Sequence, residues 1–215
     1  MSSVVLFMRS RRWPTNVLLI FASGGLIILC GPVHYSLNPG SAYLVSVVAQ
    51  IPLIASIAMY ASTTSSTPLK DEVAARNLVH WRVYHLVALT VLALLVFSLA
   101  ATQLQPPREI LLVSATQLGP VALSRNFLAL SGAAMLSGSL FGSAFGWIIP
   151  LGWATLPYLA IPTSQVSDHQ IMLLLMQGDG AFTSFVIAGC AWCVGVVVVS
   201  RNWSLLSSIN YFSRR

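Results

Sequence analysis

The feature that most constrains this chain is a series of apolar runs that are long and nearly free of charge. Four of them are clear, at residues 16–33, 42–61, 84–102 and 181–200. Each matches the roughly 20 apolar residues that a helix needs to cross the hydrocarbon core of a bilayer. Only 7% of the residues are charged, against about 25% in soluble domains. The runs therefore predict a membrane protein.

Two architectures can pair every backbone N–H and C=O group inside lipid: α-helices and closed β-barrels. Barrel strands alternate apolar and polar residues with a period of two. The apolar runs here are continuous instead, which favours helices. We expect an all-α membrane protein in which residues 1–215 form a single transmembrane domain of six helices.

The basic residues lie mostly near the ends of the apolar runs and set the expected orientation. Cytoplasmic loops carry an excess of Lys and Arg, so we expect a multi-pass plasma-membrane protein with both termini in the cytoplasm. Residues 1–15 place arginines beside an apolar patch and predict an interfacial helix on the inner leaflet, ending in a turn at Pro14. Pro52 is expected to kink the second span, because proline removes one backbone hydrogen bond.

Residues 103–180 admit two topologies, each of which gives six spans. In the first, span four is 110–124, Arg125 and Asn126 form a tight inner turn, span five is 127–149, and residues 150–180 are an extracellular or re-entrant segment. In the second, residues 103–125 lie outside, span four is about 126–142 and span five about 144–161. We favour the first, because it puts Arg125 on the cytoplasmic side.

A polar segment at residues 62–84 separates the second and third spans. Its charged and titratable residues decorate a predicted helix, in which Glu72 and Arg76 are spaced i,i+4 in the favourable order. Four of them are candidate contacts for a cytoplasmic partner: Asp71, Glu72, Arg76 and His80. We expect this helix to run on into the third span, so that a force on it would reach the membrane bundle.

Small residues recur every four positions in the second half of the chain. The row consists of Ala134, Gly138, Gly142 and Gly146. On a helix, this spacing lets two backbones approach closely. The row predicts either a subunit interface or ordinary helix packing within the bundle.

The sequence carries no signature of an enzyme or of an internal energy source. Its single lysine, Lys70, follows Leu69, so the chain has no nucleotide-binding P-loop. Cys190 and Cys193 lie in an apolar run without nearby acidic or histidine ligands, which predicts no metal or cofactor in this chain. The predicted spans also place no acidic residue at the bilayer centre, where ion-coupled carriers usually need one. We expect the energy for any transport to come from another subunit.

The chain resembles a known family of membrane proteins. An N-terminal interfacial helix, six spans and a coupling helix between the second and third spans resemble the layout of ABC transporter permeases of the ABC-2 type, with the stretch ARNLVHWRVYHL at residues 75–86 as the coupling region. The stretch SRNFLALSGAAMLSGSLFGSAFGWIIPLGWATLPYL at residues 124–159 resembles small actinobacterial permeases of this type. The resemblance implies an exporter of a peptide, lipid-like or hydrophobic compound. It also implies a separate ABC ATPase subunit that binds ATP and Mg²⁺ and contacts the coupling helix, and a second permease copy or related chain.

Two other functions remain open at this stage. A membrane scaffold or accessory subunit would use the small-residue row as its assembly surface. A membrane enzyme or an internally coupled carrier would need reactive groups, for which Arg125 and Glu109 are the best candidates. Besides protein subunits, we expect contact with membrane lipid but not with nucleic acid, because the basic residues form no patch.

Overall fold

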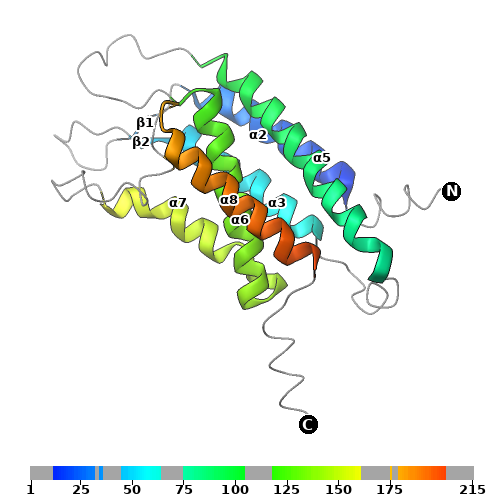
Figure 1. The fold of residues 1–215 in the computed structure, drawn as a ribbon. Coiled ribbons are helices and arrows are strands. Elements are labelled where there is room, and N and C mark those ends of the chain that lie inside the picture. The colour runs from blue at the N-terminus through cyan, green and yellow to red at the C-terminus, as the bar shows by residue number, and fades with distance from the viewer. Residues whose placement is uncertain are drawn as a thin grey trace.

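The computed structural model describes residues 12–31, 34–35, 45–63, 75–104, 118–160, 175 and 179–201, and it is helical apart from one short strand pair (Figure 1). Its elements are α2 (Trp13–Cys30), β1 (His34–Tyr35), β2 (Val45–Ser46), the 3-10 helix η1 (Val47–Gln50), α3 (Pro52–Thr63), α5 (Ala75–Ala101), α6 (Pro120–Phe141), the 3-10 helix η2 (Ser143–Phe145), α7 (Ile148–Ala160) and α8 (Phe182–Ser200). The strands pair antiparallel, with His34 opposite Ser46.

Three of these helices are long and apolar enough to cross a membrane: α2, the His80–Ala101 part of α5, and α8. Their outward surfaces carry large apolar side chains such as Leu18, Leu99 and Phe182, each about 70% exposed or more. Polar side chains such as Asn126 and Ser131 are instead fully buried. Apolar exposure on this scale needs a non-aqueous environment, so the structure supports a membrane-embedded helical protein.

Contacts near the helix ends fix the directions of the first three helices. Trp13, at the start of α2, lies against His85, near the start of α5, with the ring centroids 5.4 Å apart. Gly31, just after α2, lies against Leu104, just after α5, so these two helices are parallel. Ser62, at the end of α3, is 3.0 Å from His85. α3 therefore runs antiparallel to α5.

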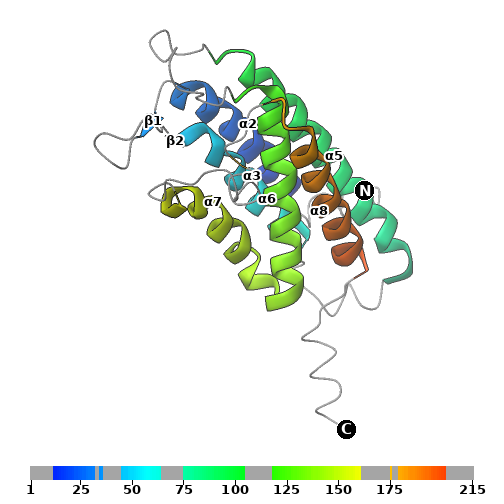
Figure 2. The same ribbon diagram turned by 60° about the vertical axis from the view of Figure 1, so that its left-hand side comes forward.

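The same kind of contact orients α6 and α8, which run parallel to each other. Asp179 lies against Gly119 before either helix begins, and Ala191 lies against Gly132 farther along. α7 runs back along α6 after a short link (Figures 1 and 2). One end of the bundle thus holds the starts of α2 and α5 and the ends of α3, α6 and α8. We call it the basic end, after its residues Arg12, Arg82 and Arg201, and the opposite one the Asp179 end.

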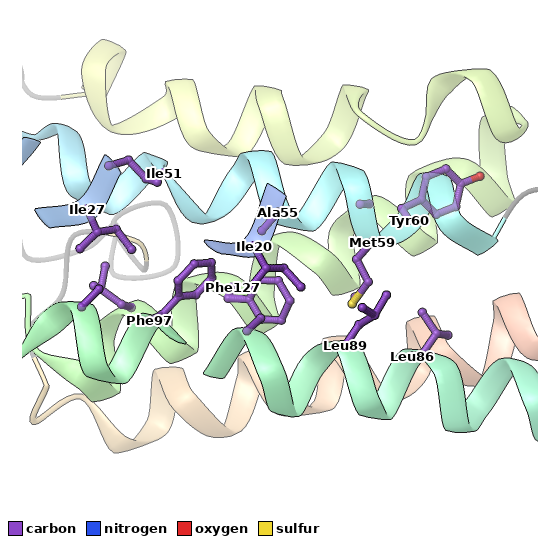
Figure 3. Packing of buried hydrophobic residues seen from close by; sticks show 14 of the residues in the cluster. Ile20, Ile27, Ile51, Ala55, Met59, Tyr60, Leu86, Leu89, Phe97 and Phe127 are labelled. Carbon is purple, nitrogen blue, oxygen red and sulfur yellow. The ribbon is translucent and has the colours of Figure 1, made fainter. Parts of the chain in front are cut away.

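α6 lies at the centre of the bundle, in contact with α3, α5, α7 and α8. The main core joins α2, α3, α5 and α6 through buried apolar side chains (Figure 3). At its middle, Phe97 of α5 meets Phe127 of α6 edge to face, with ring centroids 5.5 Å apart. This position makes α6 the helix whose polar residues are most fully enclosed.

The continuity of α6 corrects the favoured topology. The tight turn expected at Arg125–Asn126 is wrong, because α6 is helical from Pro120 to Phe141. A span at 127–149 is also wrong, since the helix ends at Phe141 and Gly142 has a φ of 97°. The second topology is closer, although α6 begins before residue 126. An arginine marks a membrane boundary only when it must reach water, and Arg125 finds its partners inside the bundle.

Two proline expectations also need correction. The second span does not run as one helix over 42–61 with a kink at Pro52: β2 and η1 come first, and α3 begins at Pro52 itself. Pro14 does not form a turn but lies in the first turn of α2. Both outcomes share a cause, because proline has no N–H to donate and its fixed φ suits the start of a helix. Residues 1–11 of the expected interfacial helix at 1–15 lie outside the described residues.

The segment at 150–180, expected to be extracellular or re-entrant, is helical in its first part. Residues up to Ala160 belong to α7, which packs against α6 and α3. Leu175 is buried in a cluster with residues of α6 and α8. α7 has 13 residues, so at about 1.5 Å per residue it is about 20 Å long, shorter than the hydrocarbon core. The expected final span at 181–200 agrees with α8.

Candidate functional site

The most unusual feature of the bundle is a charged side chain in its interior. Arg125 is 1% exposed and Asn126 is fully buried, both in the second turn of α6. The Arg125 side chain donates from Nε and Nη2 to Oδ1 of Asn126, at 3.3 and 3.1 Å. At about 1.5 Å per residue, Arg125 lies about 8 Å along α6 from its start at Pro120. Ionisable residues at such positions in membrane helices commonly mark functional sites.

Asn126 connects this charge to two segments outside the long helices. Its Nδ2 atom donates to the carbonyl oxygen of Leu175 at 2.7 Å and to that of Ala49 in η1 at 3.3 Å. Non-helical backbone at membrane depth needs such partners, because lipid offers none. One amide therefore orients the Arg125 guanidinium and satisfies two carbonyl groups.

A carboxylate closes the same region from the Asp179 end. Oδ1 of Asp179 accepts a hydrogen bond from the backbone N–H of Ala122 at 2.8 Å. The carboxylate lies so close to Gly119 that a Cβ there would collide with it. It also attracts the Arg125 guanidinium electrostatically. An acidic group at a helix N-terminus binds free N–H groups and complements the helix dipole, so Asp179 ties the start of α8 to the start of α6.

We define the α6 polar site as Arg125, Asn126, Asp179 and Gln50, which follows Ala49, a carbonyl partner of Asn126, in η1. Both polar side-chain atoms of Gln50 are buried and have no hydrogen-bond partner among the described residues. Buried amides are nearly always bonded. The site combines an enclosed positive charge with a buried amide that has spare bonding capacity.

The predicted coupling residues fall in two classes. Asp71 and Glu72 lie outside the described residues. Arg76 lies in the first turns of α5, and His80 is exposed on the same helix. The expected continuity is present from Ala75 onward, since α5 runs without a break to Ala101. The described part of the coupling region is therefore one rigid element with a candidate span.

A second polar contact holds the start of α5 at the basic end. His85 is 6% exposed, and its Nε2 atom lies 3.0 Å from the Ser62 hydroxyl. That hydroxyl donates its single proton to the Met59 carbonyl oxygen at 2.6 Å. His85 Nε2 must then be the donor toward Ser62 Oγ. His85 of α5 is thus tied to the end of α3.

The small-residue row does not lie on one helix. Gly142 ends α6 with a φ of 97°, and Gly146 lies beyond η2. Gly138 and Gly146 both lie against the Tyr60 ring of α3, where a Cβ would overlap it, and Ala134 is buried in the main core. Packing within the bundle therefore occupies these two glycines.

Sequence reasoning missed Asn126, Asp179 and Gln50. The sequence does contain a pattern that could have indicated Asn126. Arg125 and Asn126 are adjacent polar residues flanked on both sides by apolar residues, and two such side chains can be buried together if they bind each other. Asp179-Gly180 before an apolar run was a possible signal of a polar contact at the start of a helix. Nothing in the sequence pairs Asp179 with α6, because 57 residues separate it from Ala122.

Among the described residues, no group of three His, Cys, Asp or Glu side chains is placed to hold a metal ion. Comparisons with protein-family models, with curated proteins and with solved structures find no match to this chain.

Proposed function

We propose that this chain is the membrane subunit of an ATP-driven transporter, with a separate ATPase acting on the basic end of α5. In this proposal α2, η1 with α3, α5, α6, α7 and α8 form six spans, and the basic end faces the cytoplasm of the cell that holds it in its plasma membrane. Arginines at that end agree with the positive-inside rule. A second copy or a related permease chain would complete the pathway.

The length of α5 is the observation that carries the proposal. Its 27 residues make a rod about 40 Å long, about 10 Å more than the hydrocarbon core. The candidate span covers His80–Ala101, so the turns from Ala75 project beyond it. On the inner side of this rod, Leu86, Leu89 and Phe97 are fully buried. A displacement applied to the projecting turns would therefore move side chains in the core of the bundle.

The α6 polar site supports transport over a purely structural role. A charge buried in a membrane bundle is expensive and is usually retained along substrate or ion pathways. The alternative, a membrane scaffold, would use the small-residue row as its assembly surface. Gly138 and Gly146 contact Tyr60 of the same chain, so these two glycines are not available to a partner.

Site-specific photo-crosslinking tests the proposal in native membranes with the full chain. A benzophenone amino acid replaces His80 at the exposed start of α5. The matched control replaces Leu99, which is exposed on the same helix near the Asp179 end. We expect position 80, but not position 99, to capture a protein that also labels with azido-ATP and hydrolyses ATP. If position 80 captures no ATP-binding protein from membranes that contain the intact chain, the proposal is wrong.

A further inference from the structure

The break between α6 and α7 is built from glycine and held by one hydroxyl group. Gly142 has φ 97° and ψ 161°, a conformation that is nearly restricted to glycine. Ser137 donates a hydrogen bond to the carbonyl oxygen of Phe145 at 2.7 Å and accepts one from the N–H of Ile149 at 3.4 Å. The last turns of α6 thus bind both η2 and the first turn of α7, and the link has a defined shape.

An aromatic ring from another helix is wedged against this break. Tyr60 of α3 is 6% exposed, and its ring contacts Gly138 before the break and Gly146 after it. Figure 3 shows Tyr60 at one end of the row of labelled core residues. Because neither glycine has a Cβ, the ring approaches the backbone on both sides. The position of Tyr60 therefore sets the angle at which α7 leaves α6.

Tyr60 is also connected to α5. It lies two residues before Ser62, which accepts the hydrogen bond from His85 of α5 at 3.0 Å. Both residues belong to the last turn of α3, and a helical turn moves as one body. A shift of α5 would reach Tyr60 through this contact and one turn of helix, beside the contact of Thr90 of α5 with Met59 at 3.6 Å.

Among the described residues, α7 has both a packed side and an exposed side. Its main contacts are with α6 and α3, whereas Ile148 and Leu151 are exposed. Ala154 of α7 also packs in the cluster that contains Leu175 and Ala188 of α8, so a rotation of α7 about its glycine link would repack that cluster. Hinges of this kind absorb backbone rotation at a few residues.

We propose that residues 137–149 form a hinge for α7 and that Tyr60 is the positioning residue that passes movement of the α5 start, through His85 and Ser62, to this hinge. The proposal rests on the proposed function only in that an ATPase would supply the movement. The hinge and its connection to α5 are properties of this chain alone. Paired substitutions measure coupling of this kind.

Distance measurement by pulsed electron paramagnetic resonance in lipid nanodiscs tests the proposal. The full chain, with Cys30, Cys190 and Cys193 replaced by alanine, carries spin labels at Thr155 of α7 and Val194 of α8, both exposed. Thr155 lies about 14 Å along the axis of α7 from Gly146, so a rotation of α7 by about 20° about the hinge would move Thr155 by about 5 Å.

Tyr60→Ala is the main perturbation, because it removes the ring between the two glycines. We expect it to shift or broaden the α7–α8 distance by about 5 Å, as computed for that rotation. Tyr60→Phe keeps the ring and should restore the wild-type distance. Tyr84→Ala is the matched control, since Tyr84 is an exposed tyrosine on α5 near the basic end.

The link to α5 is tested with His85→Ala, which should change the distance in the same direction as Tyr60→Ala. If the signal passes through Tyr60, the double variant should match Tyr60→Ala alone. An unchanged distance in folded Tyr60→Ala, or full additivity of the two substitutions, would overturn the proposal. Should Tyr60→Ala not fold, Tyr60→Leu gives the same comparison with more of the space filled. Because no ATPase is present, the outcome is independent of the crosslinking result.

Discussion

Asn126→Ala removes four hydrogen bonds at once from the centre of the bundle. Two of them go to the carbonyl oxygens of Leu175 and Ala49, and two come from the Arg125 guanidinium. Side-chain hydrogen bonds in a membrane bundle average about 0.6 kcal/mol each, whereas bonds to a charged group in proteins contribute about 1.5 kcal/mol or more. The expected loss in the free energy of unfolding lies between about 2 and about 4 kcal/mol on these values.

Unfolding of the full chain in mixed micelles by increasing mole fraction of sodium dodecyl sulfate, followed by helical circular dichroism, measures this loss. Ser131→Ala is the matched control, because Ser131 is a fully buried polar residue of α6 whose hydroxyl, among the described residues, bonds to the carbonyl oxygen of Leu128 in the same helix. Ser131→Ala should lower the free energy of unfolding by about 0.6 kcal/mol. Asn126→Asp keeps the acceptor for Arg125 but lacks the donors, so its loss should fall between the two. If Asn126→Ala unfolds like Ser131→Ala, the α6 polar site does not organise the bundle.

Three further substitutions test individual contacts by the same unfolding assay. Gly142→Ala should lower the free energy of unfolding by about 1 to 3 kcal/mol, because alanine is strained at this φ and ψ. Gly152→Ala, in open space on α7, should instead be neutral or stabilising by up to about 1 kcal/mol; equal effects of the two would count against a glycine hinge. Gly132→Ala should destabilise the bundle, since a Cβ there meets the backbone of α8 at 2.6 Å, whereas Gly189→Ala has open space and should not. Asp179→Ala should remove the contact at the start of α6 and lower stability by about 1 kcal/mol; wild-type stability of this variant would show that the contact contributes nothing.

Much of the helical content could be predicted from the sequence. The runs at 84–102 and 181–200 correspond to α5 and α8, because an apolar run without charge has only one way to satisfy its backbone in lipid. The continuity of the polar segment with the third span also agrees with α5 from Ala75 onward. The weaker predictions were those that depended on a single residue, such as the kink at Pro52 and the turn at Arg125.

Those residues failed as signals because their effect depends on neighbours that are distant in the chain. Arg125 looked like a boundary residue, since a lone arginine in lipid must reach water. It stays inside because Asn126 accepts from its guanidinium and Asp179 attracts it. Sequence spacing alone likewise put Gly138, Gly142 and Gly146 on one helical face, although the helix ends between them.

The sequence by itself determined that this chain belongs in a membrane and that it is helical, because lipid cannot bond to a backbone and the apolar runs are local features. Only the tertiary structure decided that α6 is central, that Arg125 is enclosed, and that Tyr60 meets the α6–α7 break. These outcomes depend on which helices lie side by side. That choice follows from packing and from hydrogen bonds between residues far apart in the chain, such as Asn126 and Ala49, which no local pattern encodes.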